Sequence, residues 1–371
     1  MKWFPDEEVT TAILGICKFG ARIGYPSQRH NITIYRNLAT ALDNPQLVTI
    51  DIAAEERMNR LETYPNYIAL PSQFSASPLG LVDKADGSKR RIHHLYFLSD
   101  SPRSINGRIS EEYRTIAYVT ISKAITACRK FGNRAMLVKR DFESAFRHVP
   151  VSPLDSPLLC FEWQGIYYPE RFLPFGLRTE LYLFNHFAEV FHWILEDHFE
   201  RNETEAEVIH YLDNFLIVVP PDSHPDACST TLRDLSTEVG LSIKETKNEQ
   251  GTVVSFAGIE LDSHSMLILL PTKKLLEARF QANQAMKCDS LSPLELQTLT
   301  GYLNFVALIV PLGRTFLRRL YIIEIFFPSH RSTYRKRTSG NTRKNLSWWL
   351  TALKHHPERS IELEDREIVI I

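Results

Sequence analysis

The chain has 371 residues, of which 44% are hydrophobic and 23% are charged, and its formal net charge at pH 7 is -1. This composition is typical of a globular protein with two or three domains or one large multi-lobed domain, and not of a fibrous or disordered chain. A charge so close to zero also excludes attraction of the whole chain to nucleic acid, so any basic surface has to be local.

The cysteines and the N-terminus indicate the compartment. Five cysteines are scattered without a CxxC pair, which favours a reduced intracellular setting over a disulfide framework or a zinc site. The opening residues MKWFPDEEVT lack the basic and apolar regions of a signal peptide. No stretch approaches the ~18 apolar residues that a membrane span requires. We therefore expect a protein of the cytoplasm or nucleus that is not secreted and has no membrane partner.

The first third of the chain mixes helices with a strand pair. Residues 1–60 are mostly helical in pattern, with a loop over ARIGYPSQRHN. SPLGLVDKADGSKRRIHHL then predicts two strands joined by a turn, because Asp86–Gly87 is a strong hairpin signal. Residues 111–132 have helical spacing and end at Gly132, a suitable C-cap.

The remaining elements alternate before becoming helical. An apolar strand, RAMLVKRD, runs into Asp141, and the two strands of LLCFEWQGIYYPERF reverse near Gln164–Gly165. Further predicted elements are helices at 179–200 and 224–239, a strand over TVVSFAGIELD, and a largely helical stretch at 272–327 broken at Pro293 and Pro311–Gly313. This order predicts a mixed α+β domain followed by a helical one.

The segment EVIHYLDNFLIVVPP contains two polar residues inside a run of strand formers. Ile209–Leu212 and Phe215–Val219 are predicted strands, and a two-residue gap at Asp213–Asn214 is a common way to reverse the chain. The pair is therefore either an ordinary turn or a turn that presents a carboxylate to a metal ion.

A second carboxylate, Asp141, ends another strand of the same predicted sheet. Alone, it is most simply a helix N-cap. Together with Asp213 it matches what a magnesium pair needs, because Mg²⁺ binds one or two carboxylates while substrate phosphates supply further oxygens. Phosphoryl transfer requires mainly positioning and charge neutralisation, so few other reactive groups are needed.

At this point a family resemblance is apparent. LVKRDFESAFRHVPVSP, LPFGLRT, HYLDNFLIV and FAGIELDS resemble the palm of a retroelement reverse transcriptase, most similar to those of DIRS-like elements, which also encode a tyrosine recombinase. SPLGLVDKADGSKRRIHHL resembles the fingers, and LSPLELQTLTGYLNFVALIVPLGRTFLRRLY resembles the thumb. The resemblance implies an α+β polymerase right hand with fingers, a palm with an antiparallel sheet, and a helical thumb.

The resemblance also implies a division of the chain. The expected parts are an N-terminal extension, fingers with palm, a helical thumb, and a basic segment with a truncated connection toward an RNase H domain: residues 1–65, 66–270 (fingers mainly 66–135 and 150–175), 271–327 and 328–371. The RNase H and recombinase parts of such elements are expected to be missing from this chain.

Several site residues follow from the resemblance alone. Asp141 and Asp213 match the metal-binding carboxylates, and Lys247 matches a lysine that protonates the leaving pyrophosphate, although a surface lysine is the plain alternative. The residues that match nucleotide-binding positions are Lys84, Arg90, Phe146, Phe175 and Gly176. Core packing is the alternative for Phe146, and a solvated hairpin face is the alternative for Lys84 and Arg90. Phe256, Gly258 and Ile259 match the primer grip.

Two departures bear on activity. Asn214 stands where the family has a second catalytic Asp; Asn tolerates the positive φ of such turns, but the site loses a charge. Glu180–Leu181 replaces the family's small residue and proline, and Glu180 is expected near the template path, where it would repel phosphates.

The expected function is Mg²⁺-dependent RNA-directed DNA synthesis, with Mn²⁺ as the alternative ion. Its partners would be deoxynucleoside triphosphates and a primer on an RNA or DNA template, and Asn214 is expected to impair it. The alternatives are a catalytically inactive nucleic-acid-binding protein derived from a retroelement, or the product of a pseudogene. Basic residues at 314–344 support polymerase and binder alike. The oligomeric state is not predicted.

Overall fold

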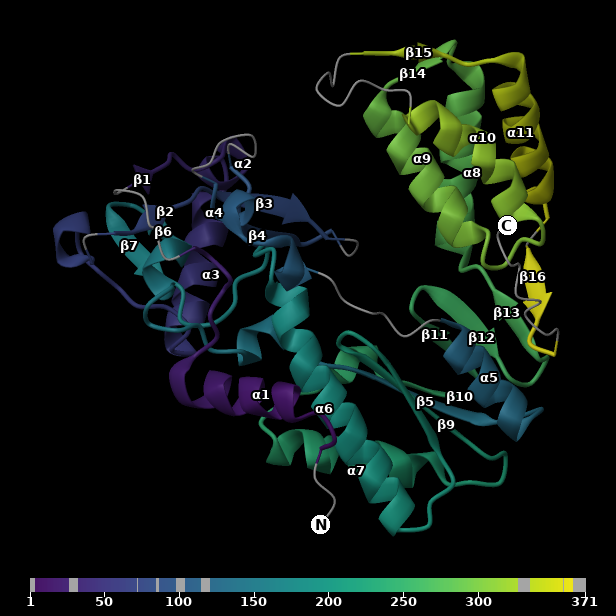
Figure 1. Ribbon diagram of the computed structural model, residues 1–371, viewed down its shortest axis with the longest axis horizontal. Helices are drawn as coiled ribbons and strands as arrows, with labels where there is room; N and C mark the ends of the chain where they lie inside the picture. The colour runs from purple at the N-terminus through teal and green to yellow at the C-terminus, as the bar shows by residue number, and fades with distance from the viewer. Residues whose placement is uncertain are drawn as a thin grey trace.

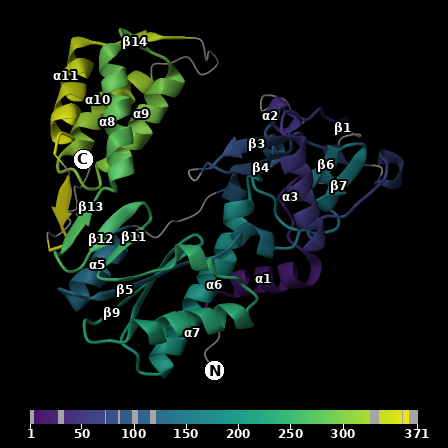
Figure 2. The same cartoon turned by 180° about the vertical axis from the view of Figure 1, so that it is seen from behind.

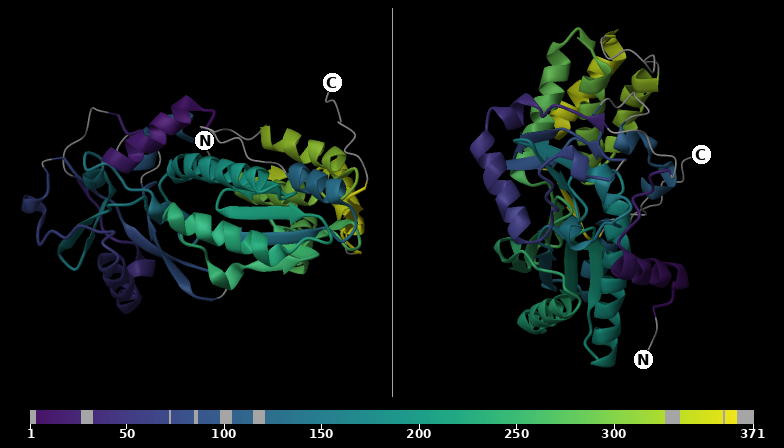
Figure 3. Two further views of the ribbon diagram at one scale, coloured as in Figure 1. Left: turned by 90° about the horizontal axis from the view of Figure 1, so that it is seen from below. Right: turned by 90° about the vertical axis from the view of Figure 1, so that its left-hand side faces the viewer.

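The computed structural model describes residues 4–26, 33–71, 73–84, 87–97, 104–114, 121–325, 334–355 and 357–362. Figure 1 shows three groups of elements: small strands and helices on the left, a sheet with long helices at the base, and a helical group at the upper right. Figures 2 and 3 show the same groups from behind, from below and from the side. They occupy the places of fingers, palm and thumb, and the mixed α+β fold is confirmed.

The first group is built on a four-stranded sheet with strand order β1-β2-β6-β7. A separate hairpin, β3 with β4, stands beside it. The strands are β1 (Thr33–Ile34), β2 (Ser75–Ala76), β3 (Leu79–Asp83), β4 (Lys89–His93), β6 (Cys160–Trp163) and β7 (Ile166–Pro169). Gln164 and Gly165 both have positive φ (53° and 83°), as a two-residue turn between twisted strands requires, so the predicted reversal is confirmed. Asp86 of the other predicted turn lies outside the described residues.

The segment predicted as an N-terminal extension packs against the fingers. The Asn37 side chain accepts from the amide of Leu79 and donates to the carbonyl of Glu162. Arg147 is buried between Glu55 and Glu170, which joins this segment to the palm as well. The helices of this segment are α1 (Glu7–Phe19), α2 (Ala39–Leu42) and α3 (Pro45–Arg57), and the 3₁₀ helix η1 (Tyr67–Ala69) follows it.

The second group contains an antiparallel sheet with strand order β10-β5-β9-β8. Its strands are β5 (Met136–Asp141), β8 (Glu207–Tyr211), β9 (Asn214–Val219) and β10 (Glu249–Gly251). The other elements of this region are η2 (Glu111–Arg114), α5 (Ile121–Phe131), η3 (Ala145–His148), α6 (Glu180–Arg201), α7 (Pro225–Glu238) and η5 (Glu245–Lys247). α4 (Ile105–Arg108) and η4 (Ser156–Leu159) lie with the first group (Figure 1). The predicted strand ending at Asp141 and the long helix near 179–200 are therefore confirmed.

Both faces of this sheet are covered, so its strands are apolar on both sides. Leu137, Leu216 and Val218 pack with α5 and the helices of the third group. Val138 and Ile217, on the opposite face, pack with α6 and α7. Because side chains alternate along a strand, Lys139 and Asp141 share the face of Leu137.

Two predicted turns differ from the structure. The β8–β9 turn consists of Leu212–Asp213, one residue earlier than predicted, and Asn214 is the first residue of β9. The predicted strand TVVSFAGIELD is a hairpin, with β11 (Val253–Phe256) paired to β12 (Ile259–Asp262) across Ala257–Gly258. β13 (Leu267–Leu269) and β16 (Glu358–Ser360) extend that sheet.

The third group is a helical bundle. It contains α8 (Thr272–Lys287), α9 (Pro293–Val306), α10 (Gly313–Ile325) and α11 (Gly340–Ala352), with the short strands β14 (Ser290–Leu291) and β15 (Lys336–Arg337). A capping box between Ser292 and Glu295 starts α9, so the break predicted at Pro293 is confirmed. α11 belongs to the bundle: Trp349 is fully buried, and Trp348 stacks on Phe316 with 3.8 Å between ring centroids. Arg331, one of the basic residues predicted at 314–344, lies outside the described residues.

Candidate active site

The two predicted metal-binding carboxylates come from adjacent strand ends. Asp141, the last residue of β5, lies opposite Asn214 in the sheet register. The amide of the next residue, Phe142, donates to the Asp213 carbonyl at 2.9 Å. Asp141 and Asp213 are therefore brought together at one edge of the palm sheet, although 71 residues separate them along the chain.

The hairpin turn differs from the prediction in which residue takes the unusual backbone conformation. Leu212 has φ 56°, whereas Asn214 lies in the strand. The predicted role of Asn214 as a residue that tolerates positive φ is therefore wrong. Its side chain instead donates from Nδ2 to Asp213 Oδ1 at 3.2 Å. Asn214 affects the site in two ways: it donates this hydrogen bond to Asp213, and it lacks the negative charge that an Asp would supply.

Burial dominates the electrostatics of the carboxylates. Asp141 is 2% exposed, and its Oδ1 has no hydrogen-bond partner. Its Oδ2 lies 3.2 Å from Nζ of Lys247 on η5, so the structure brings Lys247 to the site as predicted. Burial raises the pKa of Asp213, and the negative charge of Asp141 raises it further, while Lys247 opposes the shift.

A second ion pair at the site was not predicted. Lys139 Nζ lies 2.8 Å from Glu249 Oε1 and 4.0 Å from Asp141 Oδ1. Lys139 precedes Asp141 by two residues and so shares its face, which is a sequence signal. Glu249 could not be found in the same way, because it reaches the site through the pairing of β10 with β5.

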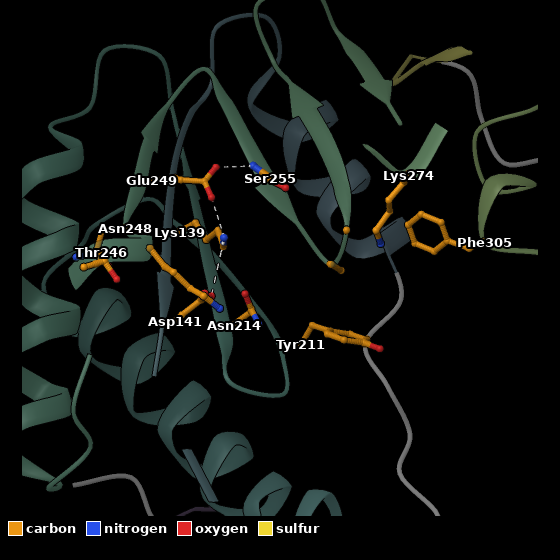
Figure 4. A pocket seen from close by; sticks show the side chains of 13 residues that line it. Lys139, Asp141, Tyr211, Asn214, Thr246, Asn248, Glu249, Ser255, Lys274 and Phe305 are labelled. Atoms are coloured by element: carbon orange, nitrogen blue, oxygen red, sulfur yellow. Dashed lines mark hydrogen bonds and ion pairs between the residues drawn. The ribbon is translucent and has the colours of Figure 1, made fainter. Parts of the chain in front are cut away.

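A cavity of about 710 Å³ is lined by Asp141, Lys139, Lys247 and Glu249, whereas Asp213 is not among its described lining residues. Figure 4 shows Asp141 and Asn214 at its base, Glu249 and Ser255 above them, and Lys274 with Phe305 on the opposite side. Lys274 Nζ lies 3.9 Å from the centroid of the Phe305 ring, and Gly258 also contributes to the wall. Gly258 has φ 84°, a backbone conformation that strains any other residue, so glycine is favoured there.

The other two predicted primer-grip residues are buried. Phe256 is 2% exposed and Ile259 is fully buried, and both belong to the core shared with the bundle. The parts of this hairpin that line the cavity are Ser255 of β11 and the turn Ala257–Gly258.

A second cluster joins three predicted nucleotide-binding residues. The Arg90 guanidinium lies over the Phe175 ring, 4.8 Å from its centroid. Phe146 meets Phe175 edge to face at 5.7 Å. Phe146 also packs against Phe184 of α6, so the alternative of core packing holds in part. Lys84 lies at the tip of the β3–β4 hairpin, where its amide donates to the Ser88 carbonyl.

The loop that carries Phe175 and Gly176 is fixed from two sides. The Asn106 side chain donates to the Gly176 carbonyl at 2.7 Å and accepts from the Arg178 amide at 2.8 Å. Glu180 accepts from the Gly176 amide at 2.9 Å. Burial raises the pKa of Glu180 to about 7, against the lowering effects of this hydrogen bond and of Arg90. Glu180 thus caps this loop, and its position near the template path stays a prediction.

The donors present fit a hard cation. Carboxylate oxygens are the ligands that Mg²⁺ prefers, and the unpartnered, buried Oδ1 of Asp141 is an available one. Within the part of the chain that the structure describes, no cluster of three or more His, Cys, Asp or Glu side chains has metal-binding geometry. The site thus offers two carboxylates and requires further oxygens from a substrate.

The predicted basic residues divide into two kinds. Arg335 pairs with Glu295, and Arg343 pairs with Asp289, so these two stabilise the bundle. Arg314, Arg318, Arg319 and Lys344 are exposed on α10 and α11. Among the described helices, none combines the length and apolar character that crossing a bilayer would take.

Comparison with known proteins agrees with this geometry. Residues 88–269 match the family described as reverse transcriptase (RNA-dependent DNA polymerase). A foamy viral protease-reverse transcriptase solved with double-stranded DNA is similar in fold, with a TM-score of 0.60 and 17% identity over 91% of this chain and 51% of that one. The same viral protein with an RNA/DNA hybrid gives a TM-score of 0.58 and 14% identity, over 95% of this chain and 44% of that one.

The chain thus spans about half the length of these solved relatives. No curated protein matches it. The family match covers β4 to β13 and includes Asp141, Asp213 and the loop at Phe175, while the fold likeness extends over nearly the whole chain. Residues 88–269 therefore form a reverse transcriptase domain.

Proposed function

We propose that this protein is an RNA-directed DNA polymerase that adds deoxynucleotides to a primer on a nucleic-acid template. The observation that carries the proposal is the meeting of Asp141 and Asp213 at the β5 and β8–β9 strand ends. The resemblance to DIRS-like elements supports an origin in a retrotransposon, with action in the cytoplasm or nucleus. The nucleic acids in the titles of the solved relatives support a duplex as the bound substrate.

The reaction forms a bond between the primer 3′-oxygen and the α-phosphorus of the nucleotide and breaks the bond to the departing pyrophosphate. Asp141 and Asp213 would hold Mg²⁺ or Mn²⁺, which when bound neutralises phosphate charge and clamps the reacting oxygens. Lys247, at 3.2 Å from Asp141, is placed to hold the proton that the pyrophosphate takes up.

The second cluster would bind the nucleotide. Arg90 supplies positive charge for the triphosphate, and its stacking on Phe175 fixes the guanidinium in place. Phe146, against Phe175, would form the surface below the sugar and exclude a 2′-hydroxyl. Gly176 and Gly258 would contact the template and the primer through their backbones, which take positive φ angles (102° and 84°) that glycine adopts without strain.

One experiment tests the proposal. A primer annealed to a homopolymer RNA is incubated with complementary dNTPs and Mg²⁺ or Mn²⁺, and extension by the wild type is compared with that by Asp141→Asn. We expect extension by the wild type only. Equal extension by both proteins would show that the chemistry occurs elsewhere.

A second candidate function is duplex binding without chemistry. Two observations favour it: position 214 carries no charge, and Lys247 already neutralises Asp141. In that case neither protein extends the primer, and both bind the duplex equally well. Primer extension by the wild type would exclude this candidate.

A further inference from the structure

The site contains an ion pair that the proposed reaction does not use. Lys139 lies on the face of the sheet that carries Asp141, and its side chain is only 10% exposed. A buried ammonium group is costly unless it has a charged partner. Two carboxylates are within reach of Lys139, so its position depends on which of them holds it.

Glu249 is the closer partner. It lies directly opposite Lys139 in the pairing of β10 with β5, and the Nζ–Oε1 distance is 2.8 Å. Its other oxygen, Oε2, accepts from the amide of Ser255 on β11 at 2.8 Å. Both oxygens of Glu249 are therefore engaged, which fixes the carboxylate between two strands (Figure 4).

This arrangement leaves Oδ1 of Asp141 without a hydrogen bond. Lys139 Nζ stays 4.0 Å from Asp141 Oδ1, beyond hydrogen-bond distance, and that oxygen has no other partner. We propose that Glu249 is a positioning residue that holds the Lys139 ammonium away from Asp141 and so keeps Oδ1 available to a divalent cation. This inference rests on the proposed function, because it concerns the same metal site.

The balance of charges gives the reason. Asp141, Asp213 and Glu249 are acidic, whereas Lys139, Lys247 and, on the opposite wall of the cavity, Lys274 are basic, so these ionised groups leave no excess negative charge to attract a cation. Without the charge of Glu249, Lys139 is free to close on Asp141 as an internal competitor. Glu249 thereby compensates in part for the carboxylate that is missing at Asn214.

The test measures metal binding without catalysis. Mn²⁺ is titrated into the full chain without nucleic acid, and free Mn²⁺ is followed by electron paramagnetic resonance. The proteins compared are the wild type, Glu249→Gln, Lys139→Met, the double variant and Asp141→Asn. Gln and Met preserve side-chain size while removing charge, and the double variant shows whether Glu249 acts through Lys139.

We expect Glu249→Gln to weaken Mn²⁺ binding about 10-fold, the lower end of the effects of residues that orient metal ligands. Lys139→Met should bind at least as tightly as the wild type. In the Lys139→Met background the Glu249→Gln change should have no further effect. That rescue excludes a failure to fold, because a misfolded Glu249→Gln protein would stay impaired.

Two results would overturn the role of Glu249 while leaving the proposed metal site intact. One is unchanged Mn²⁺ binding by Glu249→Gln while Asp141→Asn abolishes it. The other is equal weakening by Glu249→Gln with or without Lys139, which would make Glu249 a direct ligand. If Asp141→Asn binds Mn²⁺ as the wild type does, the proposed metal site itself is wrong, and this inference falls with it.

Discussion

At the residue scale, having Asn at position 214 in place of the family's Asp changes the charge of the site but not its shape. Asn and Asp have the same size, and Asn214 lies in a regular strand opposite Asp141, where an Asp would adopt the same backbone. The amide donates to Asp213, so it stabilises that carboxylate without attracting a cation. The site therefore keeps its geometry while losing part of its electrostatic stabilisation.

We expect Asn214→Asp to increase the rate of nucleotide addition about 10²- to 10³-fold, the scale on which losing one preorganised electrostatic group slows catalysis. The measurement is the initial rate of primer extension at saturating dNTP. Asn214→Ser, which is also neutral, serves as the control and should not accelerate the reaction. An unchanged rate for Asn214→Asp would mean that charge at this position does not limit the chemistry.

The raised pKa of Glu180 predicts that the stability of the fold depends on pH. Burial raises its folded pKa to about 7, above the 4.5 of an exposed Glu, so the folded state binds this proton more tightly. The associated stabilisation is complete below pH 4.5 and is lost as the pH rises through 7. Glu180→Gln, which keeps the acceptor for Gly176, should therefore be more stable than the wild type at pH 8.

The expected gain is up to about 3 kcal/mol, at 1.36 kcal/mol for each pKa unit. Urea denaturation of both proteins at pH 5 and pH 8 measures it, and the difference should shrink at the lower pH. A difference that is independent of pH would contradict the burial of an ionisable group at this position.

At the element scale, α4 fixes the loop that carries Phe175 and Gly176. Asn106 is fully buried and makes two side-chain hydrogen bonds to backbone groups of that loop. Its replacement by an apolar residue would leave the Gly176 carbonyl and the Arg178 amide without partners. The loop would then be free to move away from Arg90.

We expect Asn106→Leu to cost about 2–6 kcal/mol, because it leaves two backbone groups without partners and each costs about 1–3 kcal/mol. The KM for dNTP should rise more than kcat falls, since the loop positions the nucleotide. Denaturant unfolding and steady-state kinetics measure the two effects. Asn106→Asp keeps the acceptor for Arg178 but turns a carboxylate oxygen toward the Gly176 carbonyl, so it should be destabilised as well. An unaffected Asn106→Asp would contradict the hydrogen-bond account.

Sequence patterns located the long elements and the strands that carry the two carboxylates, but not every turn and not the cross-strand contacts. β5 and α6 were predictable because their apolar periodicity is unambiguous. The β8–β9 turn was misplaced by one residue because Leu212 is apolar and gives no turn signal, although it has the positive φ. Ala257–Gly258 is likewise a weak signal, so β11 and β12 were read as one strand.

The contacts that the sequence did not predict join segments that are far apart along the chain. Glu249 reaches Lys139, and Asn106 reaches Gly176, through pairings that span 110 and 70 residues of the chain. Periodicity within a segment carries no information about such pairings. Asp141 and Asp213 could be paired from the sequence because each ends a strand of one predicted sheet, and the resemblance to a polymerase palm supports that pairing.

At the scale of the whole molecule, charge is near neutral overall but locally basic. Arg314 and Arg318 are exposed one turn apart on α10, whereas the complete chain carries a net charge of -1. Binding of a duplex to the bundle would release counterions from the phosphates that these side chains contact. Affinity should therefore depend on salt despite the neutral total.

We expect Arg314→Gln with Arg318→Gln to weaken duplex binding and to reduce the slope of log K against log salt by about 2, or about 1 for each phosphate contact. Fluorescence anisotropy with a labelled RNA/DNA duplex at several salt concentrations measures the slope. Lys18→Gln, on the exposed surface of α1, is the matched control and should leave it unchanged. An unchanged slope in the double variant would exclude α10 from the duplex interface.

The most direct test of the account is the single-turnover addition of one correct dNTP to a primed RNA template by the wild type and by Asp213→Asn. We predict measurable addition by the wild type that requires Mg²⁺ or Mn²⁺ and the dNTP complementary to the template, and none by Asp213→Asn. Addition at the same rate by both proteins, or addition regardless of the template base, would contradict the assignment of this site to templated nucleotide transfer.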